Sequence, residues 1–499
     1  MKRLHSPQEA CQWLKEKSLS VGSKGREQKR GDLKSDSRAL QAGDVFLAWP
    51  GHSHDARAYI GEVLAKGAAA CLVHEAPEAE AVGNELQSWL EDPRVALYPN
   101  LKTDRGMLAS AYYEDPSQSL KVSAVTGTNG KTTCAWWLTQ ALTQLGCNCA
   151  IAGTLGQGRL DPKTQLIQGM NEWSSCLTTM EAVELQAQMR HWLDQGVTHL
   201  NMEASSIGLK ESRMDGTHID VAMFTNFTQD HLDYHGNMED YWLAKAMLFE
   251  RLEPKACVIN VDDPKGLELY QKLKANGRDV LGYSKSEDAQ LGIELRAKNL
   301  KVMSSRDPNA LSLDQHSSMA FEVIYQSRAY PFALNVLGDF NVSNFLAVVG
   351  ALLSMGYGID QALGACKQLS PAPGRMQAIR LPETPLVVID YAHTPDAIEK
   401  ALKSLKAVSL SQGGQLWCVM GCGGERDQSK RSAMGAAAEG LADQVVLTSD
   451  NPRREDPQVI IDQIRSGFTK PQQVKSDLDR RAAIELAVLQ ASNSDVVLI

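Results

Sequence analysis

The sequence lacks the features that mark several special classes of protein. It has no apolar run of about 18 residues and no apolar segment near its N-terminus, so neither a membrane span nor a secretory signal is predicted. It has no basic tract and a net charge of −9, which disfavours nucleic acid and anionic membranes as partners. Its ten cysteines include no CxxC pair, and there is no internal repeat. We therefore predict a cytoplasmic protein with reduced thiols.

The length and composition predict an α/β protein of several domains. A chain of 499 residues is long enough for about three domains of ordinary size, and an apolar content of 43% suffices for several cores. Strand-like and helix-like segments alternate, as they do where helices cross over a parallel sheet. We predict a small α/β module over 1–117, a central domain with a parallel sheet over 118–372, and a doubly wound, Rossmann-like domain over 373–499.

One short segment, residues 125–133 with the sequence VTGTNGKTT, predicts a phosphate-binding loop. An apolar strand-like run precedes it and a helix-like run follows it. Gly127 and Gly130 allow the backbone to turn its N–H groups toward phosphate oxygens at a helix N-terminus. Lys131 can reach the outer phosphates, and the Thr132 hydroxyl suits Mg²⁺ coordination. Two residues separate the glycines, whereas the usual P-loop has four.

Polar residues follow the predicted strands of the central domain. Glu203 comes directly after one apolar strand, His231 lies just beyond the next, and Asn260 ends a third. Because the carboxyl ends of parallel strands share one edge of a sheet, ligands bind there. We therefore expect Glu203 and His231 beside the bound phosphates, in a site for Mg²⁺ and phosphate chemistry. A predicted helix that follows carries Lys245.

The last region repeats this arrangement. Asp390 follows the predicted strand 386–389, and residues 449–453, SDNPR, follow the predicted strand 444–448. Between them lies the glycine-rich turn 421–427, GCGGERD. That turn is only a weak indication of dinucleotide binding, because it contains no GxGxxG pattern. The region therefore predicts a second doubly wound sheet with polar residues at its carboxyl edge.

Together these segments resemble the Mur ligases, the ATP-dependent amino-acid ligases of peptidoglycan precursor synthesis. The resemblance extends from about residue 35 to residue 499. Among the members of the family, those that add meso-diaminopimelate to UDP-N-acetylmuramoyl-L-Ala-D-Glu are the most similar. The motifs that carry the resemblance are GTNGKTT at 127–133, TNFTQDHLDYHG at 225–236, AKAMLF at 244–249, DYAHTPD at 390–396 and TSDNPRREDP at 448–457.

The resemblance implies ATP and Mg²⁺ as cofactors and an acyl-phosphate mechanism. The D-glutamate γ-carboxylate would attack the γ-phosphate of ATP, and the amine of the incoming amino acid would then displace phosphate. The family carries a carbamylated lysine at the position of Lys245, which exchanges a cation for an oxygen ligand. Lys131, Glu203, His231 and Lys245 form the expected catalytic set. The expected ATP-binding residues are Gly127, Thr128, Asn129, Gly130, Lys131, Thr132, Thr133, Asn260, Arg375 and Asp390, and the expected metal ligands are Thr132, Glu203, His231 and Lys245.

The resemblance also implies where the other substrates bind. The first module would bind the uridine diphosphate group through Ser37 and His52. Arg453 offers a two-pronged contact to the carboxylate that lysine lacks, which favours diaminopimelate over L-lysine. We expect a monomer. The muramoyl-dipeptide would contact Thr178, Thr179, Ser205, Glu211 and Arg213, and diaminopimelate would contact Arg426, Asp450, Asn451, Pro452 and Arg453.

The sequence departs from the family pattern in four places. Ile207 replaces a histidine and Met180 a proline, and we expect local changes in packing there. Glu211 replaces a glutamine, so a carboxylate would face an anionic substrate unless Arg213 compensates. The chain ends at Ile499, where the family continues through a Gly-Lys-Gly-His-Glu segment that helps to hold the amino group of diaminopimelate. We therefore expect either a truncated last domain or an incomplete amino-acid pocket.

Other functions fit parts of the pattern. An L-lysine-adding ligase of the same family is the nearest alternative, and a folylpolyglutamate synthetase would not need the first module. A P-loop switch or motor would hydrolyse nucleotide without an amino acid, and it would leave Asp390 and Arg453 without a role. A ligase-like protein that binds nucleotide without turnover is the remaining alternative. Phosphate release that depends on an amino acid would distinguish a ligase from the last two classes.

Overall fold

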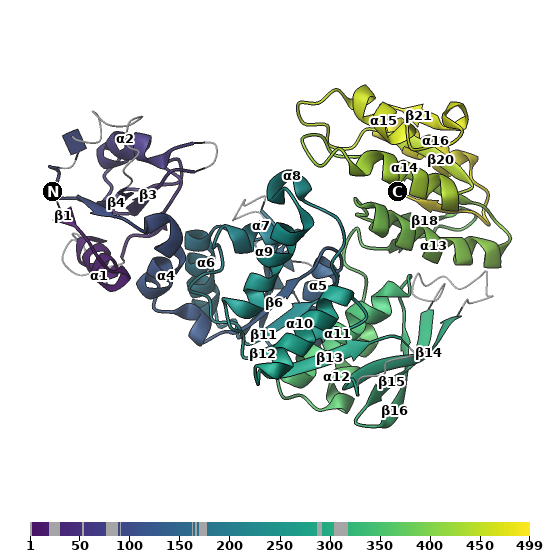
Figure 1. The fold of residues 1–499 in the computed structure, drawn as a ribbon, viewed down its shortest axis with the longest axis horizontal. Coiled ribbons are helices and arrows are strands. Elements are labelled where there is room, and N and C mark those ends of the chain that lie inside the picture. The colour runs from purple at the N-terminus through teal and green to yellow at the C-terminus, as the bar shows by residue number, and fades with distance from the viewer. Residues whose placement is uncertain are drawn as a thin grey trace.

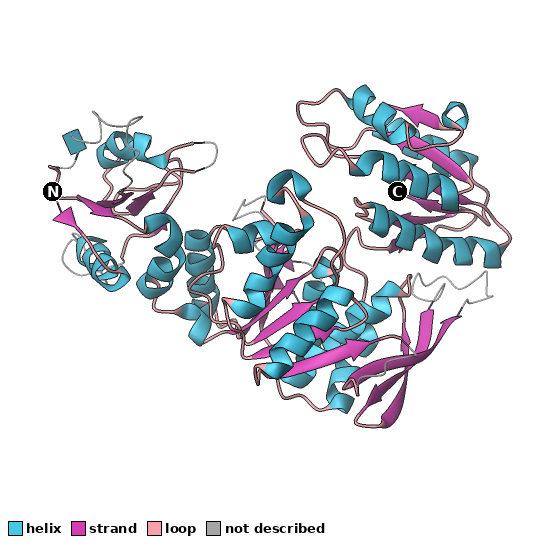
Figure 2. Ribbon diagram, in the orientation of Figure 1, coloured by secondary structure: helices cyan, strands magenta, loops and turns pink. Residues whose placement is uncertain are grey.

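The computed structural model of the chain describes residues 2–18, 30–51, 54–75, 88–89, 91–161, 163–164, 167–168, 177–286, 292–303 and 318–499. Figure 1 shows three units that follow one another along the chain, from purple through teal to yellow. Within the described residues, each unit is built on its own sheet, with five, eleven and six strands respectively. All three contain both helices and strands, as Figure 2 shows. These features confirm the predicted α/β fold class with parallel sheets.

The N-terminal unit is a parallel sheet with helices on both faces. Its elements are β1 (Lys2–Arg3), α1 (Pro7–Ser18), β2 (Leu33–Lys34), β3 (Val45–Ala48), α2 (Ile60–Ala65), β4 (Ala70–His74), β5 (Val95–Tyr98) and α4 (Leu101–Tyr112). The strand order is β1-β5-β4-β3-β2. Val45 and Leu47 of β3 pack with α1 and α4, whereas Phe46 and Ala48 pack with α2. This alternation follows from the two-residue period of a strand, so every apolar side chain of β3 is buried.

The central unit contains the long mixed sheet. Its elements are β6 (Lys121–Thr126), α5 (Lys131–Gln144), β7 (Cys149–Gly153), β8 (Gly156–Leu160), β9 (Ile167–Gln168), α6 (Ala182–Asp194), β10 (His199–Glu203), α7 (Ser206–Lys210), β11 (Val221–Phe224), α8 (Leu232–His235), α9 (Met238–Glu250), β12 (Ala256–Asn260), α10 (Pro264–Ala275), β13 (Val280–Ser284), β14 (Leu295–Met303), β15 (Ser318–Tyr325), β16 (Arg328–Leu334), α11 (Phe340–Ser354) and α12 (Ile359–Ala365). Val122 and Ala124 of β6 face a core formed with α6, α9 and α10, and Val125 faces a second core formed with α5 and α11.

The order of the central strands creates a crevice at their carboxyl ends. The order is β16-β15-β14-β13-β12-β11-β6-β10-β7-β8-β9, parallel from β14 to β7. β6 lies between β10 and β11, and the chain leaves it for one side of the sheet and returns to the other. Such a switch in direction separates the loops that follow neighbouring strands and leaves room for a ligand. The segments that follow β6, β10 and β11 therefore meet at one place.

The C-terminal unit is a second doubly wound sheet. Its elements are β17 (Gln377–Ile379), β18 (Leu386–Ile389), α13 (Pro395–Gln412), β19 (Leu416–Met420), α14 (Lys430–Leu441), β20 (Gln444–Thr448), α15 (Pro457–Arg465), β21 (Lys475–Asp477), α16 (Arg480–Gln490) and β22 (Val496–Leu498). The order is β17-β18-β22-β19-β20-β21, and only β17 pairs antiparallel. Helices α13, α14 and α15 share one core, and α16 packs in another.

Two further observations concern the sequence analysis. Within the described residues, no helix combines the length and apolar character that a bilayer span requires. The described cysteines are all free, and most of them are buried in the cores. Burial raises the pKa of the Cys418 thiol to about 12, which keeps it protonated. The prediction of core-filling thiols is confirmed for most of these residues.

Arg105 of α4 joins the N-terminal unit to the central one. Its side chain is 4% exposed. Its Nε donates to Glu181 Oε1 at 2.6 Å and its Nη2 to the Glu211 carbonyl oxygen at 2.5 Å. The guanidinium also lies 5.3 Å from the centroid of the Trp49 ring. A single buried cation thus contacts both units.

We expect Arg105→Met to lower the free energy of unfolding by about 2–3 kcal/mol, because methionine preserves the packing but leaves the Glu181 carboxylate without its charge partner. Denaturant unfolding measures this difference. Arg190→Met is the matched control, since Arg190 pairs with Asp194 on the surface of a single helix. Its expected loss is below about 0.5 kcal/mol. Equal losses in the two variants would contradict a special role for Arg105.

Candidate active site

A cavity of about 740 Å³ lies between the central and C-terminal units. Gly127, Thr179, Glu211, Arg213, Lys245 and Pro452 are not part of its wall. Ser37 belongs to the N-terminal unit, and His52 lies outside the described residues. The predicted site residues that line the cavity are Thr128, Asn129, Gly130, Lys131, Thr132, Thr133, Thr178, Glu203, Ser205, His231, Asn260, Arg375, Asp390, Arg426, Asp450, Asn451 and Arg453.

The loop between β6 and α5 has the geometry of a phosphate-binding loop. Gly127 and Gly130 have φ of 148° and 88°, a region that favours glycine. A Cβ on Gly127 would lie 1.9 Å from Thr225 Oγ1, and one on Gly130 would lie 2.5 Å from Asn344 Oδ1. Both positions therefore require glycine for space as well as for conformation. The loop leads directly into the N-terminus of α5, where free N–H groups and the helix dipole favour an anion.

Two lysine side chains converge on this loop. Lys131 Nζ donates to the carbonyl oxygens of Gly127 at 2.9 Å and Thr128 at 2.8 Å. Lys245 Nζ, from α9, donates to the same Gly127 oxygen at 2.8 Å. Lys245 is 1% exposed, and its amine lies 4.5 Å from the centroid of the Tyr241 ring. Burial and the nearby Lys131 charge lower the pKa of Lys245 well below its ordinary value, so a neutral amine is favoured.

Thr132 and Glu203 form the oxygen-rich part of the site. Thr132 Oγ1 donates to Glu203 Oε1 at 3.0 Å, and Arg375 Nη2, from the C-terminal unit, donates to Thr132 Oγ1 at 3.0 Å. Glu203 is 2% exposed, and Oε1 also accepts the backbone N–H of Thr154 at 2.8 Å. Hydroxyl and carboxylate oxygens are the donors that Mg²⁺ prefers. This pair therefore fits the predicted metal.

Two of the four predicted metal ligands contact each other, and the other two contact different residues. Thr132 and Glu203 contact each other, whereas His231 contacts Asp230 and Lys245 contacts Gly127. Among the described residues, no group of three or more His, Cys, Asp and Glu side chains is arranged as a metal site. Mg²⁺ at Thr132 and Glu203 would thus take its remaining ligands from phosphate oxygens and water, as this ion commonly does.

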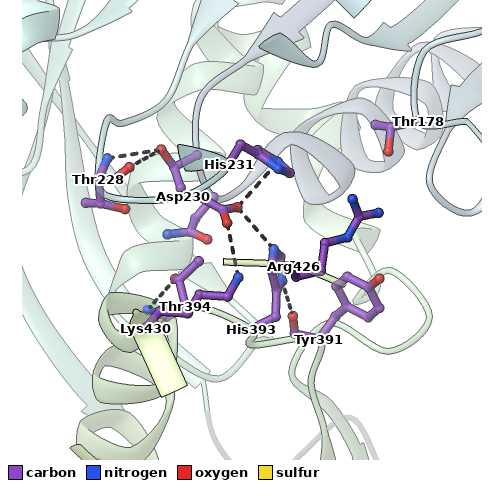
Figure 3. A network of polar contacts seen from close by, with 12 residues as sticks. Thr178, Thr228, Asp230, His231, Tyr391, His393, Thr394, Arg426 and Lys430 are labelled. Carbon is purple, nitrogen blue, oxygen red and sulfur yellow. Dashed lines mark hydrogen bonds and ion pairs between the residues drawn. The ribbon is translucent and has the colours of Figure 1, made fainter. Parts of the chain in front are cut away.

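Asp230 connects the central unit to the C-terminal one (Figure 3). Its carboxylate lies 3.2 Å from Lys430 Nζ, 3.3 Å from His393 Nε2 and 3.4 Å from His231 Nε2. Burial acts to raise the pKa of Asp230, but the hydrogen bond from His393 and the surrounding positive charges outweigh it, so the pKa lies below its ordinary value. Burial lowers the pKa of His231 to about 3, which makes it neutral at pH 7. Asp230 thus remains a carboxylate between the two units.

The part of the cavity where the amino acid is predicted to bind is formed by two loops of the C-terminal unit. Arg426 extends from the turn after β19, and its Nη1 lies 3.9 Å from Asp233 Oδ2 of the central unit. Arg453 follows β20, has a φ of 51°, and donates from Nη1 to the Gly424 carbonyl oxygen. A Cβ on Gly424 would lie 2.0 Å from the Pro452 oxygen. The glycine-rich turn therefore serves close packing against the second loop, which explains glycines that only weakly indicated dinucleotide binding.

The remaining predicted substrate residues lie together on the other side of Glu203. Thr179 Oγ1 donates to the Glu203 carbonyl oxygen at 2.8 Å and lies 3.0 Å from Ser205 Oγ. Arg213 Nη1 donates to the Thr179 carbonyl oxygen at 3.2 Å. The Glu211 carboxylate accepts a hydrogen bond from the Tyr234 hydroxyl. Glu211, which replaces the glutamine of the family pattern, thus accepts a hydrogen bond that partly offsets its charge.

Sequence reasoning missed several residues of the cavity wall. Asn341 and Asn344 begin α11, line the cavity and hydrogen-bond to each other at 3.0 Å. The Arg375 guanidinium lies 4.6 Å from the centroid of the Tyr391 ring. Asp230 is a further residue of the wall that the sequence analysis did not predict as part of the site. Two asparagines one turn apart at the start of an otherwise apolar helix are the local signal that could have identified the first pair. The contact between Tyr391 and Arg375 has no such signal.

Comparisons with known proteins agree with this geometry. The family model for the Mur ligase middle domain matches residues 125–352, and the one for the Mur ligase glutamate ligase domain matches residues 374–499. The UDP-N-acetylmuramoyl-L-alanyl-D-glutamate–2,6-diaminopimelate ligase of Acidovorax sp. (strain JS42) is 43% identical over 99% of this chain and 91% of its own length. The same enzyme of Coxiella burnetii (strain RSA 493 / Nine Mile phase I) is 39% identical over 94% of this chain and 89% of its own length.

Solved structures give the same result. A structure of a UDP-N-acetylmuramoyl-L-alanyl-D-glutamate–2,6-diaminopimelate ligase is 31% identical, with a TM-score of 0.64 over 97% of this chain and 92% of that one. A MurF ligase of Thermotoga maritima in complex with ADP shares the fold at 19% identity, with a TM-score of 0.62 over 94% of this chain and 93% of that one. The predicted resemblance is confirmed, and the chain belongs to the Mur ligase family of ATP-dependent, amide-forming ligases.

Proposed function

We propose that this Mur ligase joins meso-diaminopimelate to the D-glutamate of UDP-N-acetylmuramoyl-L-Ala-D-Glu, using ATP through an acyl phosphate. The observation that carries the proposal is that one cavity is lined both by the loop at Lys131 and by Arg426 and Arg453. ATP would bind at Lys131, the dipeptide carboxylate near Glu203 and the incoming amino acid at Arg453. The three reacting groups would then meet in one place, which accounts for much of the rate in such reactions.

The chain's own residues position the phosphates and stabilise the charge that develops on them. The N–H groups at the start of α5 would bind phosphate oxygens, and Lys131 would exchange its two loop carbonyls for the γ-phosphate. Arg375 reaches Thr132 from the C-terminal unit, so it would approach the phosphates only when the units are together. When bound, Mg²⁺ would be held by Thr132 and Glu203, with His231 and carbamylated Lys245 near a second ion, and would neutralise phosphate charge.

The reaction takes place in two chemical steps, and neither forms a covalent bond to the protein. The D-glutamate carboxylate forms a bond to the γ-phosphorus, and the bond to ADP breaks. The amine of the amino acid then attacks the carbonyl carbon, phosphate leaves, and the nitrogen loses a proton. We propose that the protein acts as a monomer. ATP and nucleotide-linked precursors are its substrates, and we propose that it acts in the cytoplasm.

The experiment that tests the proposal measures phosphate release from ATP and the dipeptide substrate, with meso-diaminopimelate or L-lysine added. We expect release that depends on diaminopimelate. Equal release with L-lysine would favour the lysine-adding alternative, and release independent of any amino acid would contradict a ligase. If neither amino acid produced release, the alternative of a nucleotide-binding protein without turnover would be favoured.

Arg453 is expected to supply the discrimination. Arg453→Lys keeps the charge but cannot make two parallel hydrogen bonds to a carboxylate, so we expect KM for diaminopimelate to rise about 10–100-fold. The matched control is Arg454→Lys. The Arg454 side chain is 93% exposed, and its ion pair with Glu425 is long, with 3.9 Å between Nε and Oε1. An unchanged KM in the Arg453 variant would contradict the assigned contact.

Asp230→Asn tests the connection between the two units. An amide still accepts a hydrogen bond but removes the charge that faces Lys430, so we expect kcat/KM for ATP to fall about tenfold. Steady-state kinetics at saturating dipeptide and amino acid measure this. Asp240→Asn is the control, since Asp240 is exposed on the first turn of α9. A change of less than about twofold in kcat/KM for ATP in the Asp230→Asn variant would show that the units come together without this carboxylate.

A further inference from the structure

Two loops of the C-terminal unit that carry the amino-acid-binding residues lie against each other. We call residues 421–426 the glycine loop and residues 449–456 the Asn451 loop. The Gly424 N–H donates to the Asn451 carbonyl oxygen at 2.9 Å, and Arg453 donates to the Gly424 oxygen. A Cβ on Gly421 would lie 2.4 Å from the Thr448 oxygen. The positions of Arg426 and Arg453 therefore depend on how these two loops are held together.

A buried arginine outside the cavity wall contacts both loops. Arg431, near the start of α14, is 1% exposed. Its Nη2 donates to the Gly423 carbonyl oxygen of the glycine loop at 3.1 Å. Its two Nη atoms also form a two-pronged pair with Glu455 of the Asn451 loop, at 2.8 Å and 3.0 Å. Nη1 further donates to Gln463 Oε1 of α15 at 2.5 Å. One guanidinium thus joins both loops to two helices.

Glu455 completes the connection from the opposite side. Besides the pair with Arg431, its carboxylate accepts the backbone N–H of Glu425 in the glycine loop. Its own N–H donates to the Pro452 oxygen at 2.9 Å, which closes the turn that carries Arg453. The hydrogen bonds from Arg431 and the Glu425 N–H hold the pKa of Glu455 down to about 2, so it is a carboxylate at neutral pH. Each partner of the ion pair therefore contacts the glycine loop.

We propose that Arg431 and Glu455 are positioning residues for amino-acid selection, which hold Arg426 and Arg453 at a fixed separation. The inference rests on the proposed function. Separating a buried guanidinium from its carboxylate partner strongly destabilises the folded protein. The pair therefore favours one relative position of the loops. A second carboxylate on the amino acid is recognised only if both arginines are in place, whereas ATP and the dipeptide bind elsewhere in the cavity. Loosening this pair would therefore affect diaminopimelate more than the other substrates.

The test compares Glu455→Gln and Arg431→Lys with the wild-type chain. In Glu455→Gln, the amide has one acceptor oxygen in place of two, and its NH₂ group would face an N–H donor of Arg431. In Arg431→Lys, the single ammonium group cannot contact Glu455 and the Gly423 oxygen together. We expect KM for diaminopimelate to rise at least about tenfold in each variant, with KM for ATP and for the dipeptide changed less than about twofold. The ratio of kcat/KM for diaminopimelate to that for L-lysine should fall in parallel. The double variant should lose little more than either single one, since both act through one contact.

Glu439→Gln is the matched control. Glu439 lies near the other end of α14, and its carboxylate likewise accepts backbone N–H groups, from Thr469 at 2.8 Å and Lys470 at 3.1 Å. The hydrogen bonds of its carboxylate go to Thr469 and Lys470 and not to either loop, so every KM should stay unchanged. Equal changes in all three KM values, or a lower kcat with an unchanged preference for diaminopimelate, would overturn the inference and assign the pair to stability alone. A wild-type chain that does not use diaminopimelate would instead overturn the proposed function.

Discussion

Lys131→Gln is expected to lower the rate of amino-acid-dependent phosphate release by about 10²–10³-fold. Lys131 Nζ lies within 2.9 Å of two carbonyl oxygens of the loop that would surround the γ-phosphate. Burial lowers its pKa, and the charges of Glu203 and Asp230 act against that shift. A phosphate would favour the charged amine further. Glutamine keeps the length and the donor but removes the charge that transfer of the phosphoryl group requires.

Single-turnover phosphate release with bound ATP measures this effect apart from product release. Lys121→Gln is the control, because Lys121 is an exposed lysine at the opposite end of β6. The fold should be preserved in both variants, which circular dichroism and thermal unfolding can verify. A loss of less than about tenfold in the Lys131 variant would contradict its role at the γ-phosphate.

Lys245→Ala is expected to lower turnover by at least about 10²-fold and to raise the Mg²⁺ concentration required for half-maximal activity. The Lys245 amine is buried, shares the Gly127 oxygen with Lys131, and has a pKa well below its ordinary value. Two ammonium groups on one carbonyl oxygen repel each other, so a neutral amine is favoured there. A neutral amine is the form that adds CO₂, and the product would offer oxygen atoms to a metal.

The modification itself has a direct readout. The wild-type chain incubated with isotopically labelled bicarbonate should show one labelled carbamate signal by NMR, and the Lys245→Ala variant should show none. Lys272→Ala is the control, because Lys272 forms an exposed ion pair with Glu250 on the protein surface. Full activity in the Lys245→Ala variant, or the same carbamate signal in that variant as in the wild-type chain, would rule out a carbamylated lysine at this position.

The geometry of the loop expected to bind phosphates could be predicted because its parts are neighbours in the chain. Gly127, Gly130 and Lys131 lie within one strand–loop–helix segment, and the contact from Lys131 to Gly127 spans four residues. Glu203 and Asn260 were predictable for a related reason, since each ends a strand of the same parallel sheet. In each case, local backbone geometry and strand direction suffice to place the side chain at the edge where ligands bind.

The residues that join the units could not be predicted in this way. Asp230 and Lys430 are 200 residues apart, and Thr132 and Arg375 are 243 apart. No local pattern encodes which partner a buried carboxylate will meet in another domain, because that depends on how two finished sheets dock. The glycines of the turn at 421–424 illustrate the difference: their pattern only weakly suggested a ligand, whereas the structure shows them packed against the Asn451 loop.

The sequence by itself determined the family, the α/β class and the phosphate loop, because each depends on contiguous motifs and on strand and helix periods. Only the tertiary structure decided that Lys245 and Lys131 share one carbonyl oxygen, and that Arg431 and Glu455 connect the loops that carry Arg426 and Arg453. Such contacts depend on burial and on the orientation of side chains from separate elements. Those are properties of the packed molecule, since removal from water and the choice of partner occur only when the elements come together.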